Sequence, residues 1–447
     1  MSSRRRYAIV GLGGRHRMFR NAINDRYDQN CELVGICDLN EGRLKLAMKE
    51  AGDVRGYHAD DFDKMIEETS PDCVIVTTRD SFHDIYICRA MELGCDVITE
   101  KPMTTDATKC QQIIDTQRKT GRKVTVSFNY RYAPPRSQVK ELLMSGVIGE
   151  VLSVDFHWVL DSKHGADYFR RWHRNKANSG GLMVHKATHH FDLVNWWLSA
   201  IPVRVFALGQ REFYTPQTAD RYGLTNRSER CHDCPDAEKC PFELKLSGNE
   251  NLQELYLDNE EHDGYFRDRC VFSDRIDIED NVNVIVDYDS GTKLSYSLNA
   301  FCPWEGYIVC FNGTKGRIEH KCEESVCVNA DGSVPGAIEK DGTWTRIFPM
   351  RAPAYEVELW TGEGGHGGAD PVMLSYIFDA ENQKPDPLMR AADYRSGAYS
   401  ILTGVAANHS MAKGEAIEVV SLVQGVGYPD YPQMPDAGSA LPLLDKK

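Results

Sequence analysis

The sequence predicts an α/β protein with two domains, a doubly wound parallel sheet followed by a domain built on a mostly antiparallel sheet. Up to about residue 128, short apolar runs alternate with helical stretches, which is typical of a parallel sheet with crossover helices. Beyond residue 280, strands separated by turns such as Asp289–Gly291 follow one another directly, which indicates antiparallel pairing. We therefore expect domains at residues 1–128 and 129–447, the second interrupted by an insertion at about 213–275.

Length and charge narrow the class of protein. At 447 residues the chain is too long for one ordinary core. Its 52 basic and 66 acidic residues give a net charge of −14, which argues against nucleic acid or an anionic membrane as a partner. The apolar run after Arg4–Arg6 is too short for a signal peptide, and no run approaches the roughly 18 residues that span a bilayer. We expect a cytoplasmic protein with reduced cysteines that acts on a small molecule.

The parallel sheet can be followed along the chain by its apolar segments. Strongly apolar, β-branched runs predict strands, and the polar-faced stretches between them predict helices. The predicted strands are 7–10, 32–37, 73–78, 95–99 and 123–128, and the predicted helices are 81–93 and 105–120.

The first strand ends in a glycine-rich turn. Residues 11–16 read Gly-Leu-Gly-Gly-Arg-His, which is close to the dinucleotide fingerprint G-x-G-x-x-G. Gly11 permits the tight turn, and Gly13 lets the backbone approach a pyrophosphate at the start of a helix. Gly14, Arg15 and His16 complete the predicted cofactor turn, although His16 stands where the fingerprint has its third glycine.

Asp38 ends the second strand. A carboxylate there accepts hydrogen bonds from the adenosine ribose and repels a 2′-phosphate, which favours NAD over NADP. Arg15 or Arg43 could soften that preference.

Other candidate cofactor contacts follow later strands, because ligands of open α/β sheets bind outside the carboxyl ends of the strands. We assign Thr77, His83, Glu100 and Lys101 to this group. His83 could instead cap or pack its helix.

A lysine follows the strand at 95–99, in the sequence Glu100-Lys101-Pro102. Proline blocks further strand pairing, so Lys101 is predicted at the edge of the sheet where ligands bind. It is a candidate for chemistry, and the competing interpretation is a surface lysine before a turn.

A second constellation lies in the segment 180–197. A continuous helix would place His185, His189, Asp192 and Trp196 on one stripe. Polar, proton-active residues on an inward face are costly unless they are paired or used, so the stripe predicts function. His185 and His189, one turn apart, could also bind a divalent ion with His366 or Asp192 as third ligand, although a hydrogen-bonded pair is the simpler explanation.

The insertion carries four of the fourteen cysteines in a polar setting, namely Cys231, Cys234, Cys240 and Cys270. Two cysteines separated by two residues can hold one ion, and two more thiolates complete a tetrahedral set. The spacing predicts a structural zinc site. An iron–sulfur cluster is the alternative metal centre, and free or disulfide-linked thiols are the metal-free interpretation.

These motifs together resemble the Gfo/Idh/MocA family of NAD(P)-dependent oxidoreductases. The resemblance rests on Gly11-Leu12-Gly13, Glu100-Lys101-Pro102, Asn129-Tyr130-Arg131 and Gly180-Gly181…His189…Asp192. It implies a Rossmann domain plus an α/β domain whose open sheet often mediates homo-oligomers, here a dimer or tetramer. It also implies a catalytic Lys101, a proton-handling His189 and sugars or cyclitols as substrates.

The resemblance also directs attention to substrate contacts. His185 stands where the family usually has an aspartate, and it could orient His189 or contact the sugar. The stretch 364–370 resembles a loop of members acting on glycosides, which makes His366 and Asp370 candidate sugar contacts beside a plain surface loop as the alternative. The remaining predicted substrate contacts are Lys101, Tyr130, Arg131, His189 and Asp192.

The predicted activity is hydride transfer between a sugar, glycoside or cyclitol hydroxyl and NAD. His189 would take the hydroxyl proton while Lys101 stabilises the developing negative charge. The alternative is an NAD-dependent glycosidase or lyase that works by transient oxidation and elimination. A catalytically silent sugar- or NAD-binding regulator would leave the lysine and the histidines unexplained.

Overall fold

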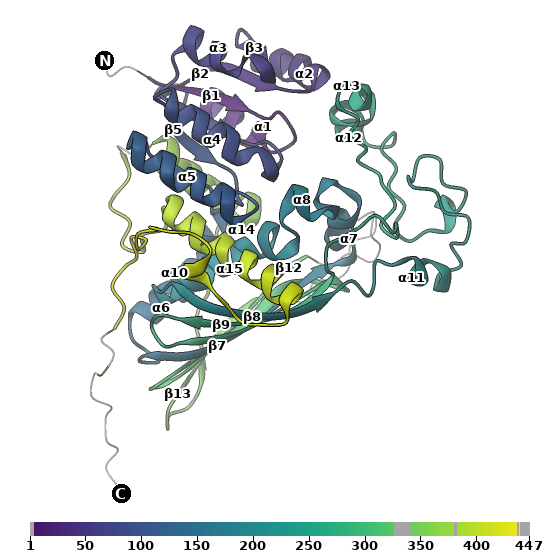
Figure 1. Cartoon of the computed structure of the whole chain (residues 1–447). Helices are drawn as coiled ribbons and strands as arrows, with labels where there is room; N and C mark the ends of the chain where they lie inside the picture. Colours follow the sequence, from purple (N-terminus) through teal and green to yellow (C-terminus); the bar gives the residue numbers. More distant parts are fainter. Residues whose placement is uncertain (1–3, 326–341, 380–381, 436–437, 439–447) are drawn as a thin grey trace, which may run out of the picture.

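The computed structural model describes residues 4–325, 342–379, 382–435 and 438 (Figure 1). In this part of the chain, the first sheet has the strand order β3-β2-β1-β4-β5-β6, and its neighbouring strands are parallel. The strands are β1 (Arg5–Val10), β2 (Cys31–Asp38), β3 (Arg55–His58), β4 (Cys73–Val76), β5 (Asp96–Thr99) and β6 (Val124–Val126). The predicted doubly wound parallel sheet is confirmed.

The helices of this domain follow the strands as crossover connections. They are α1 (His16–Asn21), α2 (Glu41–Ala51), α3 (Phe62–Thr69), α4 (His83–Glu92) and α5 (Ala107–Thr120). Side-chain caps fix two of their starts, because Asn40 accepts from Arg43 N and Asp106 accepts from Lys109 N. The segment with α2, β3 and α3 was not assigned from the sequence.

The second sheet has the order β14-β13-β12-β11-β7-β10-β9-β8-β15 over the described residues. Its β7–β10 pair is parallel and its other described pairs are antiparallel, which confirms the predicted mostly antiparallel sheet. The strands are β7 (Val151–Asp161), β8 (Pro202–Gln210), β9 (Asn281–Tyr288), β10 (Lys293–Cys302), β11 (Glu305–Gly313), β12 (Gly316–Ser325), β13 (Trp344–Pro349), β14 (Tyr355–Glu356) and β15 (Ile417–Glu418).

Helices cover the face of the second sheet that turns toward the first domain. Figure 1 shows α10 (Ala187–Leu198) and α15 (Tyr394–Lys413) between the two sheets, and every residue of α10 is buried. The set is completed by α6 (Pro134–Met144), α7 (Ser162–Arg170), α8 (Lys176–Ser179), α9 (Leu182–His185) and α14 (Gly365–Phe378). Elsewhere on the sheet Leu208 and Ile285 are 63% and 58% exposed, so part of its surface carries no cover in the single chain.

The insertion runs between β8 and β9. It contains the short helices α11 (Pro216–Arg221), α12 (Glu250–Leu255) and α13 (Glu260–Asp263), and Figure 1 shows α12 and α13 close to α2 of the first domain. The Asn40 side chain donates to the carbonyl of Asn259 at 2.9 Å. The insertion therefore connects the second domain to the first.

Within the part of the chain that the structure describes, no helix combines the length and apolar character needed to cross a membrane.

Candidate active site

A cavity of about 640 Å³ opens where the carboxyl ends of the first sheet face the helices of the second domain. Residues of both domains and of the insertion line it. Among the predicted site residues, the lining includes Gly11, Gly13, Gly14, Arg15, Asp38, Thr77, His83, Glu100, Lys101, Tyr130, His185 and His189. The structure thus brings most of the predicted site together in one cavity.

The glycine turn forms one wall of this cavity. Gly11 has a φ of +90°, and a Cβ added there would lie 2.5 Å from the backbone nitrogen of Thr78, so only glycine fits. Thr77 Oγ1 donates to the Gly11 carbonyl at 2.5 Å. These contacts hold Gly13, Gly14 and Arg15 at the surface of the cavity, where a pyrophosphate could approach the backbone.

His16 has a structural position instead of a lining one. Its ring nitrogen Nδ1 lies 2.5 Å from the Gly13 carbonyl oxygen, and its side chain is buried. Burial lowers its pKa. His16 does not occur among the described residues that line the cavity, whereas the sequence analysis expected it to contact the cofactor. Its ring instead supports the glycine turn through the Gly13 carbonyl.

Asp38 is held at the far end of the cavity. Its carboxylate accepts from the backbone nitrogens of Leu12 at 2.5 Å and Asn40 at 2.6 Å. Arg43 lies 3.5 Å from the same carboxylate. An acid fixed at the end of β2 is placed to accept ribose hydroxyls.

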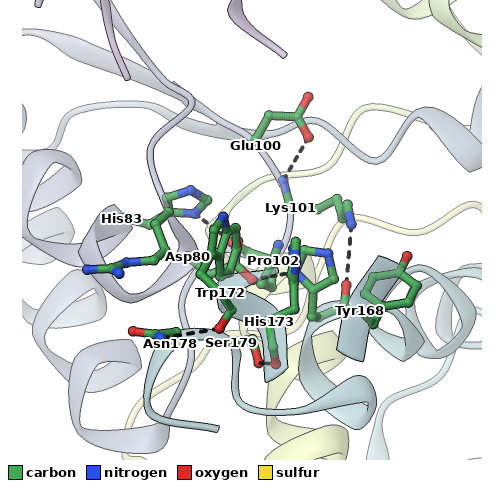
Figure 2. A network of polar contacts seen from close by, with 12 residues as sticks. Asp80, His83, Glu100, Lys101, Pro102, Tyr168, Trp172, His173, Asn178 and Ser179 are labelled. Atoms are coloured by element: carbon green, nitrogen blue, oxygen red, sulfur yellow. Dashed lines mark hydrogen bonds and ion pairs between the residues drawn. The ribbon is translucent and has the colours of Figure 1, made fainter. Parts of the chain in front are cut away.

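Lys101 lies at the centre of the site, directly after β5. Its Nζ donates to the backbone carbonyl of His185 at 3.3 Å, so the amine of the first domain reaches the second (Figure 2). Burial lowers the pKa of Lys101 to about 8. Glu100 accepts from Lys101 N at 3.2 Å and from Arg15 Nε at 2.6 Å, which anchors the start of this segment.

His185 pairs with an acid that the sequence analysis did not identify. Its Nδ1 and Asp80 Oδ2 are 2.5 Å apart, and both residues line the cavity. Burial raises the pKa of Asp80 and lowers that of His185. Asp80, which follows β4, thus holds the ring of His185 at the cavity wall.

His83 connects the two loops that follow β4 and β5. Its Nδ1 lies 2.8 Å from the carbonyl oxygen of Pro102, and its Nε2 lies 3.1 Å from that of Thr78. Burial lowers its pKa. His83 therefore lines the cavity, as expected of a cofactor contact. It also holds two loops together through their backbone carbonyls, as expected of a structural histidine.

His189 faces the cavity from α10. Its ring stacks on Tyr130 with centroids 4.0 Å apart, and Phe128 packs edge-on at 6.2 Å. Lys186 Nζ donates to Tyr130 Oη and to Glu305 Oε1, both at 3.3 Å. The imidazole is therefore held in a fixed plane beside a buried ion pair.

The predicted stripe of polar residues is not a single face. The helix is interrupted at Lys186, between α9 and α10, so His185 and His189 belong to different helices. Asp192 instead forms a bidentate ion pair with Arg131, at 2.6 and 2.8 Å, and Trp196 Nε1 donates to the Leu388 carbonyl at 2.7 Å. Neither Arg131 nor Asp192 is found among the described lining residues, which differs from the predicted sugar contacts.

The glycine-rich stretch 364–370 leads into α14. His366 lies in the first turn of that helix, and its side chain is outside the described part of the structure. Asp370 Oδ1 accepts from Asn129 Nδ2 at 2.7 Å, and its other oxygen lies 3.8 Å from Arg15. Asp370 therefore supports two cavity-lining residues.

The second domain contributes further lining residues that the sequence analysis missed. His164, Tyr168, Arg171, Trp172 and His173 all line it, and Figure 2 shows Tyr168, Trp172 and His173 on the side facing Lys101 and Asp80. Trp172 and His173 stack with centroids 3.7 Å apart. In the sequence, the cationic and aromatic run Arg170-Arg171-Trp172-His173-Arg174, which follows a long predicted strand, could have indicated these lining residues.

The four insertion cysteines lie together. Cys231, Cys234, Cys240 and Cys270 all line one small hollow of about 20 Å³, and each is recorded as a free thiol. Burial raises the pKa of Cys240 to about 11. Across the described ranges, no group of three or more histidine, cysteine or acidic side chains is already arranged to hold a metal ion. The same holds for the alternative ion at His185 and His189 among the described residues. Of its two proposed third ligands, Asp192 is paired with Arg131, and the His366 side chain lies outside the described part of the structure.

Two family models match the chain. The model described as "Oxidoreductase family, NAD-binding Rossmann fold" matches residues 5–128, and the model described as "Oxidoreductase family, C-terminal alpha/beta domain" matches residues 140–419. Both are models of the Gfo/Idh/MocA group.

Individual proteins extend the comparison. The Bacillus subtilis (strain 168) protein named "Putative oxidoreductase YteT" is 37% identical over 430 residues, which cover 93% of this chain and 98% of that protein. The D-glucoside 3-dehydrogenase of Escherichia coli (strain K12) is 30% identical over 153 residues, covering 34% of this chain and 42% of that enzyme. The structure of the WlbA dehydrogenase from Bordetella pertussis with NADH and UDP-GlcNAcA shares the fold at a TM-score of 0.62 and 16% identity, covering 93% of this chain and 99% of that one.

Proposed function

Because the chain belongs to the Gfo/Idh/MocA oxidoreductase family, we propose that it is an NAD-dependent dehydrogenase acting on a hydroxyl of a sugar or glycoside, with cyclitols as the related substrate class. One observation carries the proposal. Lys101 of the first domain and His189 of the second line the same cavity as the glycine turn and Asp38. A dinucleotide along the turn would place its reactive end toward this lysine and histidine.

The lining supports a polyhydroxylated ligand. Aromatic rings with a few polar groups among them are typical of small-molecule pockets, and Tyr168, Trp172 and His173 supply such rings here. The named D-glucoside dehydrogenase points to the same substrate class through its sequence similarity.

The residues of the chain divide the chemistry between them. NAD, when bound along the glycine turn, would supply the acceptor for the hydride that leaves the carbinol carbon. The proton of the hydroxyl passes to the imidazole of His189, because histidine is the side chain that most often serves as a general base. The Lys101 ammonium stabilises the negative charge that develops on the same oxygen. The products are the ketone, the reduced cofactor and one proton.

His185 and Asp80 act beside this pair. The carboxylate of Asp80 fixes the ring of His185, and the carbonyl of His185 accepts from Lys101. We propose that this chain of contacts positions the Lys101 amine toward the substrate oxygen.

NAD is the proposed cofactor in preference to NADP. The support is Asp38 at the end of β2, whose carboxylate is fixed by two backbone hydrogen bonds. A negative charge held there repels a phosphate.

The insertion cysteines are proposed to hold a structural zinc ion. The support is the spacing of Cys231 and Cys234 together with the single hollow that all four thiols line. Binding would require the thiols to deprotonate and turn toward a common centre.

Reduction of NAD by a panel of sugars, glycosides and cyclitols tests the proposed function. The nicotinamide absorbance is followed with enzyme in excess over NAD, so that one turnover suffices. At least one compound should reduce NAD, and release of free NADH under turnover separates a net dehydrogenase from a redox-neutral glycosidase or lyase. Failure of every compound to reduce bound NAD would contradict the proposal.

A further inference from the structure

The insertion forms part of the cofactor end of the cavity. Tyr256, Asp263 and Tyr265 line it together with Gly14, Asp38 and Arg43 of the first domain. The hydroxyl of Tyr256 lies 3.9 Å from the position that a Cβ on Gly14 would occupy, so this side chain faces the glycine turn. A segment that interrupts the second domain thus meets the pyrophosphate and ribose positions of the first.

Arg43 lies between two acids at this end. Its guanidinium contacts Asp263 at 2.5 Å and Asp38 at 3.5 Å, and the three side chains are 12%, 11% and 7% exposed. The tighter contact is the one from the insertion. Arg43 lies five residues after Asp38, the acid expected to bind the ribose. In related cofactor sites an arginine at such a place can accommodate a 2′-phosphate.

We propose that Asp263 is a specificity-determining residue that makes the cofactor site select NAD over NADP. It holds Arg43 in an ion pair, so the guanidinium is not available to a 2′-phosphate. In this proposal the insertion contributes to the selection of NAD over NADP. This inference rests on the proposed function, because it requires a nicotinamide dinucleotide in the cavity.

The geometry distinguishes Asp263 from its acidic neighbours. Glu261, on the same short helix, is exposed and does not appear among the described residues that line the cavity. Arg79, another cation of the cavity wall, stacks over Phe82 at 4.6 Å, and the charge of Asp263 also acts on it. Because the direct ion pair of Asp263 is with Arg43, release of Arg43 is the main consequence expected when Asp263 loses its charge.

Direct binding of NADH and NADPH to the full-length protein tests this inference without any substrate. The ratio of the two dissociation constants is measured by fluorescence titration for wild type, Asp263→Asn, the matched control Glu261→Gln, and the double variant Arg43→Gln/Asp263→Asn. Asp263→Asn should move the ratio toward NADPH by about tenfold, equivalent to about 1.4 kcal/mol. Glu261→Gln should leave the ratio unchanged, and removing Arg43 as well should abolish the gain.

The ratio is independent of the fraction of folded protein, because both ligands are titrated into the same preparation. Asp263→Ala provides a second reading of the same change. An unaltered ratio in both Asp263 variants, with NADH still bound, would overturn the inference while leaving the proposed function intact. A gain that persists without Arg43 would overturn the role assigned to the ion pair. Wild-type protein that binds neither dinucleotide would instead contradict the proposed function.

Discussion

Asp80 of the first domain and His185 of the second are joined by a hydrogen bond of 2.5 Å between Oδ2 and Nδ1. The two residues are 105 positions apart in the sequence and meet at the wall of the cavity. Because Lys101 donates to the carbonyl of the same His185, this contact links the acid, the histidine and the lysine across the domain boundary.

The first prediction is that Asp80→Asn lowers turnover by roughly tenfold or more. We expect a smaller loss than the roughly hundredfold or greater loss typical of a residue that transfers the proton itself, because Asp80 is proposed only to position another residue. The amide lacks the ionisable carboxyl group of Asp80, so its hydrogen bond to the His185 ring should be weaker and the Lys101 contact less firmly positioned. NADH affinity should change little, because the glycine turn is untouched. Turnover and NADH titration measure the two effects.

A double-variant comparison separates positioning from general damage. If Asp80 acts through His185, Asp80→Asn should cost little further activity in a His185→Ala background, since coupled residues are not additive. Asp84→Asn is the matched control, because Asp84 is a buried acid that pairs with Lys109 at 3.5 Å and is absent from the described cavity lining. Additive losses, or an equal loss from Asp84→Asn, would contradict the positioning role.

A second prediction concerns pH. Lys101 has a pKa lowered to about 8 by burial, so its positive charge is complete well below pH 8 and is lost as the pH rises through that value. Because the proposed mechanism needs the ammonium, the turnover rate should fall above about pH 8. Lys101→Arg keeps its charge throughout this range, so whatever activity it retains should lack the falling limb. A wild-type rate that continues to rise above pH 8 would exclude the role of the ammonium.

A third prediction assigns Arg131 and Asp192 to stability. Their side chains are 0% and 1% exposed, and removing one partner of a buried ion pair typically costs about 3–5 kcal/mol. Asp192→Ala should therefore lower the free energy of unfolding by about this amount, measured by denaturant titration where unfolding is two-state. Joint replacement by Arg131→Met and Asp192→Leu should cost less than the single change. A stable Asp192→Ala variant with a strongly raised KM for the sugar would contradict this prediction and would support the earlier expectation that Asp192 contacts the substrate.

A fourth prediction tests the cysteine cluster. Elemental analysis of the purified protein should find about one zinc per chain, as expected for a four-thiolate structural site. Cys234→Ser should reduce that content and lower the melting temperature. Cys302→Ser is the control, because Cys302 lies outside the lining of the hollow. Protein without zinc or iron, and colourless when prepared without oxygen, would contradict metal binding.

Much of the site could be predicted because its signals are local in the sequence. The turn at Gly11 requires a residue without a Cβ, and Asp38 and Lys101 each follow an apolar strand whose carboxyl end faces the cavity. The alternation of strands and helices likewise gave the first domain. The turn-separated strands beyond residue 280 predicted the mostly antiparallel pairing of the second sheet.

The missing parts depend on contacts between distant segments. No local pattern pairs Asp80 with His185, or Arg43 with Asp263, because each pair joins different domains or an insertion. The break at Lys186 has no glycine or proline at that position to mark it, so the histidines were expected on one helix. The helical pattern indicated that Asp192 is buried, but it did not indicate that Arg131 is its partner. Asp192 was therefore expected to contact the substrate.

The central claim is that Lys101 and His189 act together on one hydroxyl while the cofactor binds independently. The most direct measurement is single-turnover reduction of NAD by the reactive sugar in wild type, Lys101→Ala and His189→Ala, with NADH affinity titrated in the same preparations. The account predicts that either substitution slows the reduction by about a hundredfold or more while NADH affinity changes little. A folded variant at either position that reduces NAD at a near-normal rate would contradict it.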